Sequence, residues 1–144
     1  LKVIAFTGSL RKASVNHGLL RFAQSAGVKH DLNVNIISTQ LPLYNSDLEV
    51  ALPPEVTAFR NAVQGADCLL LGVQEYNWSY SGVLKNALDW TSRNLGGQQP
   101  FAGKLVGMIG AGGGLGASRA QYHLRQVRKH VKPFTVFAVR VFSP

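Results

Sequence analysis

The chain has 144 residues, a length typical of one domain, and 46% of them are hydrophobic, which excludes an intrinsically disordered protein. No apolar run approaches the ~20 residues of a membrane helix, so we expect no membrane span. The single cysteine, Cys68, excludes an intrachain disulfide and argues against a cysteine-based metal site. It also favours a reducing, cytoplasmic compartment, although a chain that begins at Leu1 rather than Met leaves a targeting segment open.

The net charge of +8 is unevenly distributed. Seven basic and seven acidic residues balance each other between Leu1 and Asp89, whereas the segment from Trp90 onward has eight basic residues and no acidic one. Two interpretations fit this excess. It attracts an anionic ligand or partner, or an acidic segment beyond Pro144 balances it.

Apolar strand-like runs alternate with helix-period runs along the chain. Five strands are predicted, at Lys2–Thr7, Leu32–Ser38, Asp67–Val73, Lys104–Gly110 and Phe134–Phe142. Four helices are predicted: from Ser14 to about Ala26, from Pro53 and Pro54 onward, at Gly82–Thr91 and at Ser118–Val131. This alternation predicts an α/β fold with a doubly wound five-stranded parallel sheet, in a single domain spanning residues 1–144. Ligands of such sheets bind at the carboxyl ends of the strands.

The loop after the first strand, Gly8–Asn16, opens the first helix and suits a phosphate, because backbone N–H groups and the helix dipole meet there. Side chains that can add donors are Ser9, Arg11, Ser14 and Asn16. Gly8 permits a tight turn. Ala13 and Ser14 occupy the positions where a P-loop needs Gly and Lys, which argues against triphosphate hydrolysis. The alternative is an ordinary strand–helix turn with a serine cap.

The loop after the third strand, Gln74–Gly82, is rich in aromatic and amide side chains. Aromatic rings there can stack on or flank a planar ligand. The alternative is that Tyr76, Trp78 and Tyr80 pack inside the protein or contact a dimer partner.

The loop after the fourth strand, Gly110–Ser118, is rich in glycine. Gly112, Gly114 and Ala117 match the dinucleotide pattern GxGxxG/A only loosely, and no acidic residue follows to bind a ribose. We interpret the loop as a surface where backbone amides approach a flat ligand closely. The alternative is a flexible glycine-rich loop.

The last predicted helix is basic. A nucleic-acid-binding helix is one interpretation, but Arg125, Arg128 and Lys132 have the spacing of a solvated helix face. We therefore expect no nucleic-acid partner. The four histidines lack metal-ligand spacing with acidic or cysteine partners, so we also expect no metal site.

Together the three loops resemble the NADPH-dependent FMN reductase family, the flavodoxin-like quinone and azo reductases. The matching stretches are GSLRKASVN at Gly8–Asn16, EYNWSYSGVLKNALDW at Glu75–Trp90 and GGGLGASRAQYHLR at Gly112–Arg125. The resemblance implies a flavodoxin-like sheet with strand order 2-1-3-4-5, whose usual last helix is missing from this sequence. The second motif usually begins with Pro, where this chain has Gln74.

The resemblance also implies the roles of individual residues. Those that would hold the phosphate of flavin mononucleotide (FMN) are Ser9, Arg11, Ser14 and Asn16. Those that would line its ribityl chain and ring are Gln74, Glu75, Tyr76 and Asn77, while Gly112 and Gly113 would approach the pyrimidine edge. No catalytic side chain is implied. Trp78 and Tyr80 would lie near a partner chain, in a homodimer or homotetramer.

The activity that the resemblance implies is two-electron transfer from NADPH or NADH, through FMN, to a quinone, a flavin or a similar acceptor. The alternative is a flavodoxin-like one-electron carrier without direct NAD(P)H activity. Such carriers are typically acidic, whereas this chain is basic.

Overall fold

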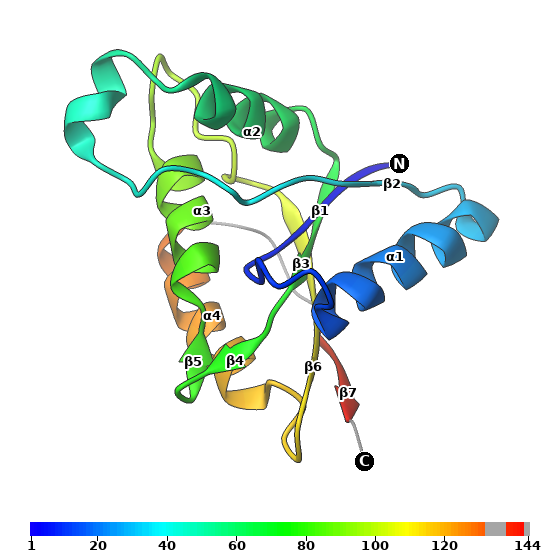
Figure 1. The fold of residues 1–144 in the computed structure, drawn as a ribbon. Helices are drawn as coiled ribbons and strands as arrows, with labels where there is room; N and C mark the ends of the chain where they lie inside the picture. Colours follow the sequence, from blue (N-terminus) through cyan, green and yellow to red (C-terminus); the bar gives the residue numbers. More distant parts are fainter. Residues whose placement is uncertain (132–137, 143–144) are drawn as a thin grey trace.

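The computed structural model describes residues 1–131 and 138–142, with side chains up to Val127 (Figure 1). Its strands are β1 (Lys2–Thr7), β2 (Asn33–Ile36), β3 (Cys68–Gly72), β4 (Glu75–Tyr76), β5 (Ser79–Tyr80), β6 (Leu105–Gly112) and β7 (Ala138–Phe142). Its α-helices are α1 (Val15–Gly27), α2 (Pro54–Gln64), α3 (Gly82–Ser92) and α4 (Ser118–Val131). Two short 3₁₀ helices are η1 (Val28–His30) and η2 (Ser46–Val50). No described helix is both long and apolar enough to cross a membrane.

The main sheet is parallel and has the order β2-β1-β3-β6-β7. The predicted α/β class and the flavodoxin-like order of the first four strands are confirmed. The fifth predicted strand, Phe134–Phe142, lies partly outside the described residues. Its described part is β7, which pairs with β6. Because all these strands run the same way, the loops after β1, β3 and β6 meet at one edge.

Alternating side chains of β1 divide the core between the two faces of the sheet. Ile4 and Phe6 join the larger cluster, which α2, α3 and α4 cover, and the Phe6 and Phe59 rings meet edge-to-face at 5.1 Å. Val3 and Ala5 point to the opposite face, where they pack with Leu20 of α1. The two clusters therefore place α1 on one face of the main sheet and α3 and α4 on the other (Figure 1).

The β4–β5 hairpin was not predicted. Its strands pair antiparallel with Tyr76 opposite Ser79, and the two turn residues, Asn77 and Trp78, have φ of 47° and 66°. Positive φ at both central positions is what a type I′ turn requires. A tryptophan rarely adopts this conformation, so the sequence carries no ordinary hairpin signal here.

The long connection between β2 and α2 is fastened to α3 and to the loop after it. The Tyr44 hydroxyl donates to Oε1 of Glu49 at 2.7 Å, and Nε of Arg93 donates to the same oxygen at 2.7 Å. The backbone N–H of Tyr44 also donates to Oδ1 of Asn86 in α3. We call the contacts among Tyr44, Glu49 and Arg93 the latch, in which Glu49 accepts both side-chain hydrogen bonds.

Replacing Glu49 by glutamine is expected to lower stability at neutral pH but not in acid. The hydrogen bond from Arg93, followed by that from Tyr44, lowers the pKa of Glu49 below the ordinary value of 4.5. A lowered folded-state pKa stabilises the protein above about pH 4.5, and this advantage is lost as the pH falls through the lower value. Urea titrations of Glu49→Gln and the parent chain at pH 7 and in acid measure the difference.

The control for the latch is Asp31→Asn, because Asp31 already occupies a left-handed conformation that asparagine tolerates. The same urea titrations of Asp31→Asn show how far the loss of one exposed carboxylate outside the Glu49 contacts alters stability at each pH. A Glu49→Gln difference that stays constant into acid would contradict the role of the Glu49 charge.

Candidate functional site

The segment of residues 8–16, which links β1 to the first turn of α1, presents a row of backbone donors. Ser14 caps α1, its Oγ accepting the N–H of His17 at 3.2 Å. Within the described residues, the backbone N–H groups of Arg11, Lys12 and Ala13 donate no hydrogen bond. In the first turn of α1, the N–H groups of His17 and Gly18 donate to Ser14, so only those of Val15 and Asn16 add to the row. We call this segment the cradle loop, because its donors and the positive end of the helix dipole suit an anion.

Gly8 serves close packing rather than an unusual turn, since its φ is not positive. The Ser81 hydroxyl donates to the carbonyl of Gly8 at 3.0 Å and accepts the N–H of Leu84 at 3.1 Å, where it caps α3. A Cβ at Gly8 would lie 2.2 Å from Oγ of Ser81. The absent side chain therefore lets the cradle loop rest on the start of α3.

Asn16 fastens the cradle loop to the end of β6. Its Nδ2 donates to the carbonyl of Ala111 at 3.1 Å, and its Oδ1 accepts the N–H of Ala111 at 2.9 Å. The side chain is buried, so it holds the loop in place from within. Ser9 and Arg11, by contrast, line a pocket between α1 and residues 38–40, which is described below.

Gln74 lies beneath the cradle loop and is 4% exposed. Its Oε1 accepts from Oγ1 of Thr7 at 3.5 Å, whereas its buried Nε2 has no hydrogen-bond partner among the described residues. A Cβ at Gly8 would lie 2.9 Å from this Nε2. Leaving a buried donor unpaired costs about 1–3 kcal/mol, so Nε2 is a donor that a rearranged or occupied cradle loop could use.

Glu75 joins the β4–β5 hairpin to the start of α4. Its Oε2 accepts the N–H groups of Arg119 and Ala120 at 3.1 and 3.2 Å, and its Oε1 accepts Nη1 of Arg119 at 3.2 Å. The guanidinium of Arg119 lies 3.9 Å from the centre of the Trp78 ring. The Glu75 carboxylate thus supplies the negative charge that stabilises a helix N-terminus.

A pocket of about 420 Å³ separates the hairpin from the glycine-rich loop. Glu75, Asn77 and Trp78 line one side, and residues 113–117 line the other. A Cβ at Gly113 would meet nothing within 4 Å, whereas one at Gly112 would lie 3.5 Å from the N of Ala117. The space beside Gly113 is therefore open on the side where a side chain would stand.

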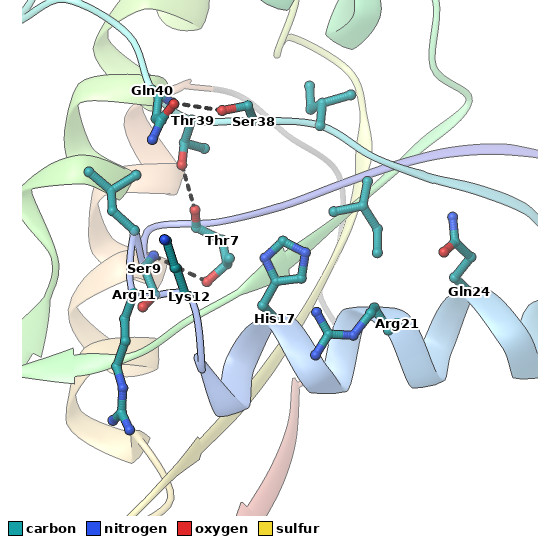
Figure 2. A pocket seen from close by; sticks show the side chains of 13 residues that line it. Thr7, Ser9, Arg11, Lys12, His17, Arg21, Gln24, Ser38, Thr39 and Gln40 are labelled. Atoms are coloured by element: carbon teal, nitrogen blue, oxygen red, sulfur yellow. Dashed lines mark hydrogen bonds between the residues drawn. The ribbon is translucent and has the colours of Figure 1, made fainter.

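A second pocket, of about 540 Å³, lies between α1, the cradle loop and residues 38–40 (Figure 2). It is the pocket that Ser9 and Arg11 line, and Lys12, His17 and Arg21 line it as well. None of these three residues was predicted as a site residue, although His17 and Arg21 have the four-residue spacing of one helix face.

The predicted site residues therefore fall into two groups at one edge of the sheet. The cradle loop holds Ser9, Arg11, Ser14 and Asn16, and the smaller pocket holds Glu75, Asn77 and Gly113. The side chain of Tyr76 is 52% exposed and that of Trp78 is 67% exposed. Tyr80, which the resemblance places near a partner chain, is half-buried and packs against the larger core cluster.

A parallel sheet of this order, with its candidate site at the carboxyl edge beside the first strand, defines a flavodoxin-like α/β protein. Residues 1–143 match the NADPH-dependent FMN reductase family. The chain belongs to that family.

Individual relatives agree with this assignment. The chain is 52% identical to a probable NADPH:quinone oxidoreductase 1 of Oryza sativa subsp. japonica, covering 88% of this chain and 66% of that protein. It is 43% identical to an NAD(P)H-dependent FMN reductase of Pseudomonas aeruginosa, covering 88% and 68%. It superposes on the flavoenzyme FerB, an NAD(P)H:(acceptor) oxidoreductase from Paracoccus denitrificans, with a TM-score of 0.86 and 35% identity, covering 94% and 74%. The chain thus spans just under two thirds of the rice relative's length.

Proposed function

We propose that residues 1–144 form one flavodoxin-like domain of an FMN-dependent NAD(P)H oxidoreductase that passes two electrons to a quinone, a flavin or a similar acceptor. The observation that carries this proposal is the row of unpaired backbone donors in the cradle loop, at the same sheet edge as an open pocket between an aromatic hairpin and a glycine-rich loop. The names of the relatives support the same activity.

The residues present fit FMN. In the cradle loop, backbone N–H groups with Ser9, Arg11 and Ser14 would hold the phosphate, and Asn16 would keep the loop in place. Backbone atoms of Gln74, Glu75, Tyr76 and Asn77 would line the ribityl chain and the ring. Gly112 and Gly113 would face the pyrimidine edge with backbone N–H groups. The unpaired Nε2 of Gln74 adds a donor close to Gly8.

FMN, when bound, supplies hydride chemistry between a nicotinamide nucleotide and the acceptor. The protein's own contribution is binding and orientation. Backbone donors at Gly112 and Gly113 would stabilise negative charge at the pyrimidine edge. The exposed rings of Tyr76 and Trp78 would flank a flat acceptor, and no side-chain nucleophile or base is needed.

The FMN content of the purified chain tests the proposal. We expect a yellow protein after incubation with FMN, whose flavin absorbance is bleached directly by NADPH or NADH in stopped-flow mixing and restored by a quinone. A protein that takes up no FMN would refute the proposal. Bound FMN that neither nucleotide bleaches would instead favour a one-electron carrier.

We also propose a homodimer or homotetramer in the cytoplasm. The large exposed side chains of Tyr76, Trp78, Leu115 and Tyr122 support an interface near the smaller pocket. The single cysteine supports a reducing compartment. Sedimentation velocity measures the oligomeric state.

A further inference from the structure

The side-chain amide of Gln74 is buried beneath the cradle loop and is only partly hydrogen-bonded. Its Oε1 accepts from Oγ1 of Thr7 at 3.5 Å, and its Nε2 has no partner among the described residues. Most buried polar side chains in folded proteins are paired, because a buried donor without a partner destabilises the folded state. The packing of the ligand-free chain therefore does not explain why a glutamine stands here.

The contacts of Gln74 lead directly to the cradle loop. Oγ1 of Thr7, which donates to Gln74, also accepts the backbone N–H of Ser9 at 3.4 Å (Figure 2). Both of these hydrogen bonds are longer than usual, whereas the one from Oγ1 of Thr39 to the carbonyl of Thr7 has a normal length of 2.8 Å. The end of β1 is thus firmly held, and the Ser9 N–H is held only weakly.

An acceptor for the free donor of Gln74 lies close by. Nε2 is 2.9 Å from the position that a Cβ at Gly8 would occupy. Among the described residues, the carbonyl of Gly8 accepts one hydrogen bond, from the Ser81 hydroxyl at 3.0 Å. A carbonyl oxygen can accept two, so the Gly8 carbonyl has room for Nε2.

The Gly8–Ser9 peptide unit links this acceptor to the proposed phosphate site. Because the unit is planar and trans, the Gly8 carbonyl and the Ser9 N–H point in opposite directions. A rotation that releases the Ser9 N–H from Thr7 and turns it outward, toward an anion, also turns the Gly8 carbonyl inward, where Nε2 is buried. Glycine tolerates such a backbone rotation better than any other residue.

We propose that Gln74 is a positioning residue for the phosphate of FMN, an inference that rests on the proposed function. When the Ser9 N–H turns toward the phosphate, Nε2 of Gln74 donates to the carbonyl of Gly8 and holds the cradle loop in its binding conformation. The free chain contains an unpaired donor and the bound chain does not, so this difference adds to the affinity for FMN. Riboflavin, which lacks the phosphate, gains nothing from it. Gln74 thus favours FMN over riboflavin.

Gln74→Met tests the proposal, because methionine is also long and unbranched but has no donor. Loss of an unpaired donor should leave the urea midpoint of the FMN-free chain unchanged or raise it. The same substitution should weaken FMN binding about tenfold, the effect of one hydrogen bond, and leave riboflavin binding as in the parent chain. Quenching of flavin fluorescence measures both affinities. A residue that only supports the fold would not lower affinity without lowering stability.

The matched control is Gln99→Met, since Nε2 of Gln99 is paired. It donates to the carbonyl of Ser92 at 2.9 Å, and Gln99 lines neither of the two pockets beside the cradle loop and the hairpin. This variant should have a lower urea midpoint and unchanged affinities for FMN and riboflavin. The two glutamine variants should therefore differ in opposite ways from the parent chain.

NMR of the ¹⁵N-labelled parent chain supplies a readout that needs no variant. FMN should move a side-chain N–H signal of Gln74 downfield, as a new hydrogen bond does, and riboflavin should not. Equal shifts with the two flavins, an FMN affinity that Gln74→Met leaves unchanged, or a parallel loss of stability and of both flavin affinities would overturn this proposal alone. Failure of the parent chain to take up FMN would refute the proposed function instead.

Discussion

The Gly8→Ala variant is expected to unfold at a lower urea concentration than the parent chain and to lose most of its FMN affinity. The new Cβ would lie 2.2 Å from Oγ of Ser81 and 2.7 Å from Cβ of Leu84. Neither atom can move away cheaply, because Ser81 caps α3 and Leu84 is buried in that helix. Overpacking of this kind costs about 1–3 kcal/mol, and the alternative is displacement of the cradle loop.

The matched control is Gly82→Ala, one residue beyond Ser81. A Cβ at Gly82 would meet nothing within 4 Å, and the residue begins α3. Alanine there should leave stability unchanged or raise it slightly, because it is the better helix former. Urea titration and quenching of FMN fluorescence measure the two effects. A Gly8→Ala protein that matches Gly82→Ala in both would show that the cradle loop does not need its close contact with α3.

Replacing Asn16 by alanine is expected to cost about 2–4 kcal/mol of unfolding free energy, because a buried N–H and a buried carbonyl of Ala111 would lose their partners. The cradle loop would also lose its attachment to β6. We therefore expect weaker FMN binding together with lower stability. Chemical denaturation and FMN titration of the same preparation measure both quantities.

The Asn16→Asp variant distinguishes two roles of Asn16, an interaction with the helix dipole and the pair of hydrogen bonds to Ala111. Aspartate in the first turn of a helix is normally favourable, so it should be harmless if Asn16 acts only through the helix dipole. A carboxylate, however, places an oxygen against the carbonyl of Ala111 where Nδ2 now donates. We expect the aspartate variant to be destabilised as well. Normal stability with weakened FMN binding would instead mean that the amide contacts the ligand.

Regular elements were well predicted because their signals are local. β1 and α4 have the predicted bounds, and the other predicted helices agree within a residue or two. The β4–β5 hairpin was missed because its turn places Trp78 at a positive φ, against the usual preference of tryptophan. Long-range attachments also leave no local signal. The sequence marks Asn16 as a donor but does not reveal a partner 95 residues away.

The clustering of charge in the folded protein could not be predicted from the sequence either. Residues 1–89 are neutral in sum, so the positive excess in the sequence lies in the last third of the chain. Folding brings Lys12 and Arg21 to one pocket that has no carboxylate among its lining residues. A sum along the chain cannot detect a local field that arises from which residues fold together.

The contacts from Glu75 to Arg119 and from Arg119 to Trp78 have a thermodynamic consequence. They hold the hairpin against the start of α4 in the free protein, so the wall of the smaller pocket that Glu75 and Trp78 form is preorganised. A flat ligand that enters there orders few side chains, and little conformational entropy is lost on binding. Affinity at this pocket should therefore depend on contacts with the ligand rather than on a change in the shape of its walls.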